Sequence, residues 1–211
     1  MAYGEKFEEA LIYAASVHRG QTRKGTNIPY VTHLLAVAAI VGENGGTEDE
    51  VVAALLHDAP EDQGGEPRLE DIRMRFGDEV TGIVAGNSDT FKNPKPPWRE
   101  RKEAYVSRVA REPEPVRLVS AADKLHNARS VLADLRSVGD EIWRRFNGGK
   151  DGTLWYYPGA GRSLRDRRLE PRGRGAGPGC GRAGAPHRQE RVGGTLCRTS
   201  RYASASWGRP G

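Results

Sequence analysis

The segment LLHDAPED, residues 55 to 62, concentrates four ionisable side chains at the end of an apolar run. They are His57, Asp58, Glu61 and Asp62. A carboxylate that is buried needs a partner, and a divalent cation is a sufficient one. Two interpretations therefore compete for this segment: a solvated acidic helix end, or half of a metal site.

The other half of such a metal site is predicted at His33 and Asp123. His33 opens one apolar segment and His57 closes the next, so antiparallel helices joined by a short turn would bring both histidines to the same side. Asp123 lies in SAADKLHN, where the alanines and Leu125 indicate partial burial. Each histidine alone is more typical of an ordinary core or surface group. Together with two aspartates they favour a mixed nitrogen and oxygen ligand set.

Such a ligand set suits Mn²⁺, Fe²⁺ or Zn²⁺ better than Ca²⁺, which prefers oxygen alone. Residues 1–157 contain no cysteine, which argues against a closed structural zinc site and excludes thiol catalysis there. Glu61 and Asp62 follow His57 by about one helical turn and could orient a water or protonate a leaving oxygen. Pro60 is the predicted break that separates this pair from the helix before it.

Helices are the elements predicted to position these residues. Apolar side chains recur at helical spacing, and no stretch shows the strict alternation of a strand. Thr47 and Glu50 form a capping-box pattern that begins the helix carrying His57. We therefore predict an all-α domain, with helical segments at about residues 7–18, 33–44, 50–58, 69–76, 79–85, 99–111, 116–135 and 141–146.

The composition changes abruptly at Pro158. Residues 158–211 contain 12 arginines, no lysine and three acidic residues, a net charge of +9, which leaves −4 of the total +5 for residues 1–157. With 12 glycines and only four large aliphatic side chains, this tail is predicted to be disordered. It is either a natural basic tail or an out-of-frame translation of GC-rich DNA. The amphipathic LWYY segment stops unfinished, which favours the second reading.

Composition also narrows the function classes. No run of about 18 apolar residues is present to span a membrane, and the first residues lack the pattern of a secretion signal. A cytoplasmic protein is therefore expected, with both cysteines, Cys180 and Cys197, in the tail. The basic tail lacks a folded reading element and would give only salt-sensitive, non-specific binding to nucleic acid. The sequence predicts no oligomeric state.

The order and flanks of these motifs resemble the HD-domain metal phosphohydrolases, and within them the Rel/Spo-type alarmone hydrolases. The resemblance runs from about Lys6 to Tyr157. It rests on RKGTNIPYVTH (23–33), LLHDAPED (55–62), FGDEV (76–80) and ADKLHN (122–127). It implies an HD-domain helical bundle that hydrolyses the 3′-pyrophosphate of guanosine tetra- or pentaphosphate (ppGpp or pppGpp), giving GDP or GTP and pyrophosphate. The length suits a small, single-domain hydrolase.

The resemblance also implies roles for individual residues. One metal ion, usually Mn²⁺ in the family, would be bound by His33, His57, Asp58 and Asp123. Glu61 and Asp62 would activate and position the attacking water. Substrate would be contacted by Arg23, Lys24 and Asn127, with Arg145 and Lys150 as weaker candidates.

Some positions depart from the family pattern. His18 and His126 match no ligand position and are interpreted as structural. The family continues after WYY with another helix, which PGAGRSLRD is not expected to form. Two alternatives therefore stay open: an HD phosphohydrolase acting on another nucleotide, or an inactive or truncated homologue that binds metal or nucleotide without turnover.

Overall fold

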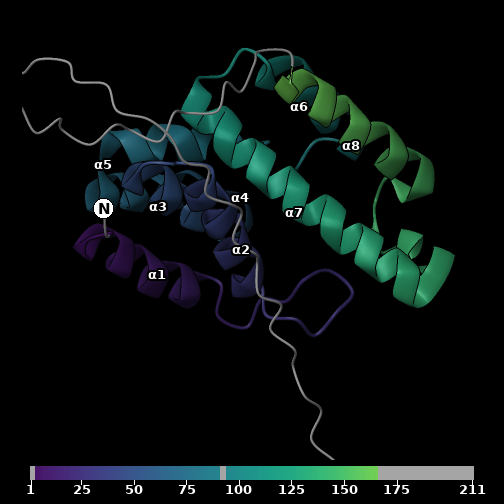
Figure 1. The fold of residues 1–211 in the computed structure, drawn as a ribbon, viewed down its shortest axis with the longest axis horizontal. Helices are drawn as coiled ribbons and strands as arrows, with labels where there is room; N and C mark the ends of the chain where they lie inside the picture. The colour runs from purple at the N-terminus through teal and green to yellow at the C-terminus, as the bar shows by residue number, and fades with distance from the viewer. Residues whose placement is uncertain (1–2, 91–93, 166–211) are drawn as a thin grey trace, which may run out of the picture. The chain divides into compact units, whose positions relative to one another are not determined.

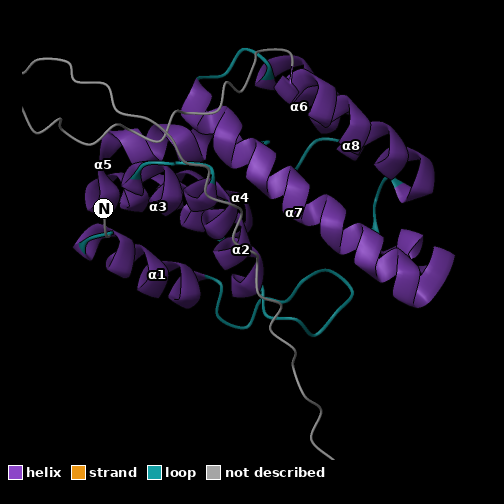
Figure 2. Ribbon diagram, viewed as in Figure 1, coloured by secondary structure: helices purple, strands orange, loops and turns teal. Residues whose placement is uncertain are grey.

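A computed structural model describes residues 3–90 and 94–165, and within these ranges the chain forms helices and no strand (Figure 2). An isolated bridge between Thr22 and Pro29 closes the loop after the first helix. The elements are α1 (Glu5–Val17), α2 (Val31–Glu43), α3 (Glu48–Leu56), α4 (Ala59–Asp62), α5 (Gly65–Asn87), α6 (Trp98–Val109), α7 (Glu114–Val138), the 3-10 helix η1 (Gly139–Arg145) and α8 (Gly149–Arg165). The predicted all-α class is confirmed. Both cysteines and residues 166–211 of the predicted tail lie outside the described residues.

The capping box predicted at the start of α3 is present. The Thr47 hydroxyl accepts a hydrogen bond from the Glu50 amide, and the Glu50 carboxylate accepts one from the Thr47 amide at 2.7 Å. Reciprocal bonds of this kind satisfy two amides that a helix start would leave without partners. The rest of α3 is apolar and buried, so its C-terminal end delivers His57 into the interior.

The chain breaks between α3 and α4 at His57 and Asp58 rather than at Pro60 itself. Pro60 lies in the first turn of α4, where its missing N–H is not needed. That missing N–H and the proline ring prevent α3 from continuing past Leu56. The predicted gap between helical segments 69–76 and 79–85 corresponds to Gly77, inside α5, where a φ of 88° departs from helical geometry.

Helix α7 lies between two apolar clusters, and Figure 1 shows it crossing the molecule with α1–α5 on one side and α6 and α8 on the other. The larger cluster receives Leu118, Val119 and Ala122 from α7 and buries side chains of α1, α2, α3 and α5 against them. The smaller cluster joins α6 to α8, with Ala121 of α7 packed against it. The segment of α7 that carries Asp123 thus runs along the seam between the two clusters.

Helix α8 corrects the expectation that the chain loses its structure after Tyr157. The helix continues through Pro158 to Arg165, and Gly159, Ala160 and Leu164 are buried against α6. Pro158 removes the N–H that would bond the Leu154 carbonyl, but Leu154 is 56% exposed and water can reach that turn. Burial of Ala160 and Leu164 in the cluster with α6 stabilises the helix beyond the proline. Residues 158–165 therefore belong to the helical domain.

Within the described residues, no helix combines the length and the hydropathy needed to cross a membrane.

Candidate metal centre and substrate cavity

Two buried imidazoles from neighbouring helices face each other at the centre of the domain. His33 lies in the first turn of α2 and is 0% exposed, and His57 caps the C-terminus of α3 and is 2% exposed. Their ring centroids are 5.3 Å apart. The Nδ1–H of His57 donates to the Ala54 carbonyl at 2.8 Å, which turns the Nε2 lone pair of His57 toward His33.

Two carboxylates complete the cluster. Nε2 of His33 lies 3.2 Å from Oδ1 of Asp123 and 3.6 Å from Oδ2 of Asp58. Nε2 of His57 lies 3.0 Å from Oδ2 of Asp58 and 3.8 Å from Oδ1 of Asp123. Despite these distances, neither buried Nε2 makes a hydrogen bond. Nitrogen lone pairs and carboxylate oxygens that converge without bonding to one another are the arrangement expected of ligands around a shared cation.

The electrostatics of the cluster favour positive charge at its centre. Burial opposes charge on Asp58 and Asp123, yet His57 beside Asp58, and Lys124 beside Asp123, hold the pKa of each carboxyl well below its usual range. Burial likewise opposes charge on His57, but Asp58 raises the pKa of that imidazole well above its ordinary value. A divalent cation would satisfy the same carboxylates and displace the proton from the imidazole.

The donors that are present therefore fit a divalent metal ion. Ligand atoms of His33, His57 and Asp58 lie within 4.8 Å of one another, and Oδ1 of Asp123 adjoins both imidazoles. Two nitrogen and two oxygen donors suit Mn²⁺, Fe²⁺ or Zn²⁺. The structure brings together the four residues that the sequence singled out as ligands.

Each aspartate is held by a residue that sequence reasoning missed. The Tyr30 hydroxyl donates to Oδ2 of Asp58 at 2.6 Å, and Lys124 forms an ion pair with Oδ2 of Asp123. Burial and the adjacent Asp58 raise the pKa of Tyr30, so its hydroxyl stays a donor. Tyr30 precedes His33 by three residues, a helical spacing that could have marked it as a neighbour of the site.

Glu61 and Asp62 lie on α4 beside the cluster. Glu61 accepts from the Asp89 amide at 3.1 Å and pairs with Lys95 at 3.0 Å. Asp62 accepts from the Gln21 side-chain amide at 2.8 Å. Burial, and then the charge of Asp58, raise the pKa of Asp62 to about 6. A carboxyl group with this pKa is mostly ionised at neutral pH and can still take up a proton.

A cavity of about 560 Å³ opens onto the cluster. Asp58 and Asp123 line it together with Glu61 and Asp62. Basic and amide side chains contribute to the same wall: Arg23, Lys24, Lys102, Lys124 and Asn127. A smaller compartment of about 180 Å³ shares several of these residues and is lined by the aromatic side chains Trp98, Phe146, Tyr156 and Tyr157.

The predicted substrate residues divide into two groups. Arg23, Lys24 and Asn127 line the cavity, whereas Arg145 and Lys150 lie outside its lining. Arg145 packs over Gly25 and pairs with Asp134 at 3.0 Å, so it supports the loop that carries Arg23. Lys150 pairs with the exposed Asp140 at 3.1 Å. Lys102 was not singled out from the sequence, because only the fold brings α6 to the cavity, and Lys124 was not singled out although it directly follows Asp123.

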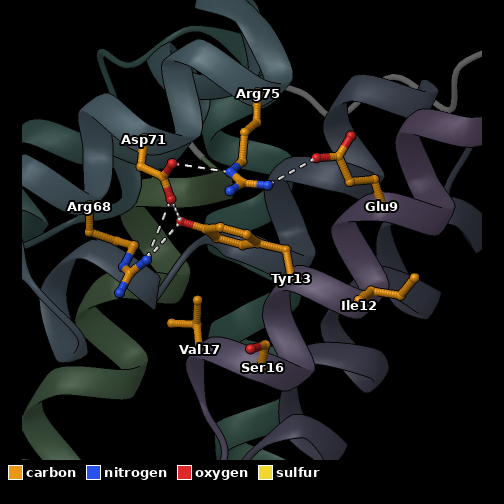
Figure 3. Close-up of a pocket in the computed structure, with 8 residues that line it drawn as sticks. All are labelled: Glu9, Ile12, Tyr13, Ser16, Val17, Arg68, Asp71 and Arg75. Carbon is orange, nitrogen blue, oxygen red and sulfur yellow. Dashed lines mark hydrogen bonds and ion pairs between the residues drawn. The ribbon is translucent and has the colours of Figure 1, made fainter.

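A second hollow, of about 450 Å³, lies between α1 and α5 (Figure 3). The Tyr13 hydroxyl donates to Asp71 at 2.6 Å, and the guanidinium carbons of Arg68 and Arg75 lie 5.7 and 5.3 Å from its ring centroid. Asp71 pairs with both arginines, and Arg75 also pairs with Glu9. These charges compensate one another, so the cluster ties the two helices together.

Paired imidazoles and carboxylates at the centre of an all-helical domain form a candidate metal site in an all-α protein. The model of the HD domain matches residues 10–154. The guanosine-3′,5′-bis(diphosphate) 3′-pyrophosphohydrolase MESH1 of Xenopus tropicalis is 38% identical over 138 residues, which cover 64% of this chain and 72% of that one. The chain belongs to the HD-domain family.

Other relatives show how the domain is used in different proteins. A GTP pyrophosphokinase of Streptomyces coelicolor is 40% identical over 128 residues, 60% of this chain but only 15% of the kinase. Among solved structures, a metazoan ortholog of SpoT described as hydrolysing ppGpp aligns with a TM-score of 0.65 at 29% identity, covering 78% of this chain and 88% of that one. A Listeria monocytogenes protein aligns with a TM-score of 0.56 at 39% identity, covering 63% and 82%.

Proposed function

We propose that this chain is a metal-dependent hydrolase that removes the 3′-diphosphate of guanosine tetra- or pentaphosphate, giving GDP or GTP and pyrophosphate. The observation that carries the proposal is the convergence of two imidazole Nε2 atoms and two carboxylates at a cavity with a basic wall. The names of the Xenopus enzyme and of the SpoT ortholog supply the substrate.

In this proposal His33, His57, Asp58 and Asp123 hold one divalent ion, with Mn²⁺ as the expected metal. When bound, the ion supplies Lewis-acid stabilisation of the phosphoryl oxygens and lowers the pKa of a water. Tyr30 fixes Asp58 through Oδ2, the same oxygen that lies beside the imidazoles, and Lys124 fixes Asp123 through Oδ2 while its Oδ1 lies beside them. Ligands oriented in this way need little rearrangement when the ion binds.

Asp62 is the proposed general base. Its oxygen takes a proton from the attacking water, whose oxygen forms a bond to the phosphorus attached at the ribose O3′. The bond from that phosphorus to O3′ breaks, the pyrophosphate departs with the water oxygen, and O3′ takes up a proton from solvent. Glu61 lies next to Asp62 and orients the water, while Lys95 and the Asp89 amide hold Glu61 in place.

The cavity wall matches the rest of such a substrate. Arg23, Lys24, Lys102 and Lys124 place positive charge where phosphate groups would lie, and charge-assisted hydrogen bonds to phosphate are strong. The aromatic side chains of the smaller compartment offer flat faces for a guanine base.

The experiment is a pyrophosphate-release assay with ppGpp, with and without added Mn²⁺. We expect release that depends on the metal, and Asp123→Ala should abolish it. Asp78→Ala is the matched control, because Asp78 is 92% exposed and pairs only with an exposed arginine among the contacts of the described chain. Turnover that persists in a chelator would contradict the metal role. Faster hydrolysis of dNTPs or of other 3′-phosphorylated nucleotides would reassign the substrate.

A further inference from the structure

The second imidazole contact of the site involves His126, on α7. Its Nδ1 lies 2.7 Å from Nδ1 of His33, and the two ring centroids are 4.8 Å apart. At this distance the two nitrogens share one hydrogen, so one ring donates and the other accepts. The direction of this bond decides which nitrogen of His33 is free to bind a metal ion.

The surroundings of His33 Nε2 decide the direction. That atom is fully buried and makes no hydrogen bond, although Oδ1 of Asp123 is only 3.2 Å away. A divalent ion that binds His33 at this atom needs a nitrogen that carries no hydrogen. The hydrogen belongs on Nδ1, where His126 accepts it.

His57 provides a parallel within the same site. Its Nδ1–H donates to the Ala54 carbonyl at 2.8 Å, and its Nε2 likewise faces the carboxylates. Both histidines thus expose the same nitrogen to the centre, one held by a backbone carbonyl and the other by a side chain. Outer partners of this kind fix the tautomer and ring orientation of metal-binding histidines.

We propose that His126 is a positioning residue of the metal centre: its Nδ1 accepts the Nδ1–H of His33 and holds the Nε2 lone pair of His33 toward Asp58 and Asp123. The proposal rests on the metal site of the proposed function. It adds a role for a histidine that the sequence pattern placed among the structural residues.

Two substitutions separate the acceptor from the bulk of the ring. In His126→Asn the amide Oδ1 occupies nearly the position of the imidazole Nδ1 and can accept the same hydrogen bond. In His126→Leu the side chain keeps a similar volume but has no acceptor. A role in packing alone predicts that Leu is tolerated at least as well as Asn, whereas the positioning role predicts the reverse.

The experiment titrates the full-length, metal-stripped chain with Mn²⁺ alone and measures the dissociation constant. We expect His126→Leu to weaken Mn²⁺ binding about 10- to 100-fold and His126→Asn to stay within about 3-fold of the unsubstituted protein. Equal affinity of His126→Leu and the unsubstituted protein would overturn the proposal, as would equal losses in both variants. If the unsubstituted protein itself binds no Mn²⁺, the metal site falls as well, so the two failures are distinguishable.

A measurement on the unsubstituted protein removes any dependence on how the variants fold. Imidazole ¹⁵N spectra of the chain loaded with diamagnetic Zn²⁺ report which ring nitrogen of each histidine carries hydrogen. We expect the Nδ1–H tautomer at His33. A hydrogen on Nε2 of His33 would refute the proposed direction of the bond.

Discussion

Arg23 and Asn127, which are 104 residues apart in the chain, are joined by a hydrogen bond of 2.5 Å from the guanidinium Nη2 to the amide Oδ1. Asn127 in turn donates to Oδ1 of Asp123, the oxygen that faces the two imidazoles. The loop before α2 is therefore connected through one amide to the candidate metal centre. A phosphate that binds Arg23 would therefore lie close to that centre.

Substitution of Arg23 should therefore weaken substrate binding more than it slows the chemical step. Hydrogen bonds to charged groups contribute about 1.5–3 kcal/mol, so we expect Arg23→Ala to raise KM at least about tenfold while kcat changes little. Steady-state kinetics with ppGpp measure both constants. Arg19→Ala, which changes an exposed arginine in the turn after α1, should leave KM unchanged. An unaltered KM in Arg23→Ala would exclude a substrate contact.

The acid limb of the pH–rate profile should report Asp62. Its pKa is raised to about 6, so the ionised form that accepts a proton is lost as the pH falls through that value. Gln21 stabilises the ionised form by donating a hydrogen bond. Gln21→Leu should therefore raise the pKa further and move the acid limb to higher pH, with the plateau rate retained. Gln63→Leu removes a donor to Gln21 without touching Asp62 and should shift the limb less. An acid limb that does not move in Gln21→Leu would argue against Asp62 as the base.

Tyr30→Phe should lower the affinity for Mn²⁺. The substitution removes only the hydroxyl that holds Oδ2 of Asp58, and partners of metal-binding carboxylates affect affinity by about tenfold or more. A matched control exists at Tyr13, whose hydroxyl holds Asp71 in the hollow between α1 and α5. Calorimetric titration with Mn²⁺ should show weaker binding by Tyr30→Phe than by the control variant Tyr13→Phe. Similar affinities for both would show that the Tyr30 contact contributes nothing specific to the site.

The end of α8 should contribute to the stability of the domain. Leu164 is 6% exposed, and truncation of a buried leucine to alanine costs about 2–5 kcal/mol. Leu154 lies on the same helix but is 56% exposed, so Leu154→Ala should change the free energy of unfolding by less than about 0.5 kcal/mol. Urea denaturation of Leu164→Ala and Leu154→Ala measures the two changes in the free energy of unfolding. If Leu164→Ala were as stable as Leu154→Ala, the packing of Leu164 would contribute nothing to the stability of the domain.

Local patterns were enough to predict much of this architecture. The Thr47 and Glu50 capping box and the break near Pro60 depend on residues close in sequence, and both are present. His33, His57 and Asp58 could be grouped because a short turn joins α2 to α3, whereas Asp123, on the distant α7, was added because its apolar neighbours indicate burial and because of the family resemblance. Their metal-binding role stays a prediction.

Contacts between distant segments could not be predicted in the same way. Tyr30 with Asp58, and His33 with His126, depend on the packing of α2 against α3 and α7. Pro158 misled the sequence interpretation, because helix propensity is local whereas the burial of Leu164 depends on α6. Lys102 also could not be predicted from local sequence, because it lines the cavity only through the tertiary placement of α6.

The separation of His33 from His126 by 93 residues has a consequence for how the chain and its ion depend on each other. The donors come from α2, from the end of α3 and from α7, so a chain in which α7 has not docked offers only part of the set. An ion that binds the complete set but not the unfolded chain stabilises the folded form in proportion to the logarithm of its free concentration. Retention of the ion during purification is thus a readout of completed folding. A preparation in which α7 is undocked would lose both the bound ion and the stability that the ion confers.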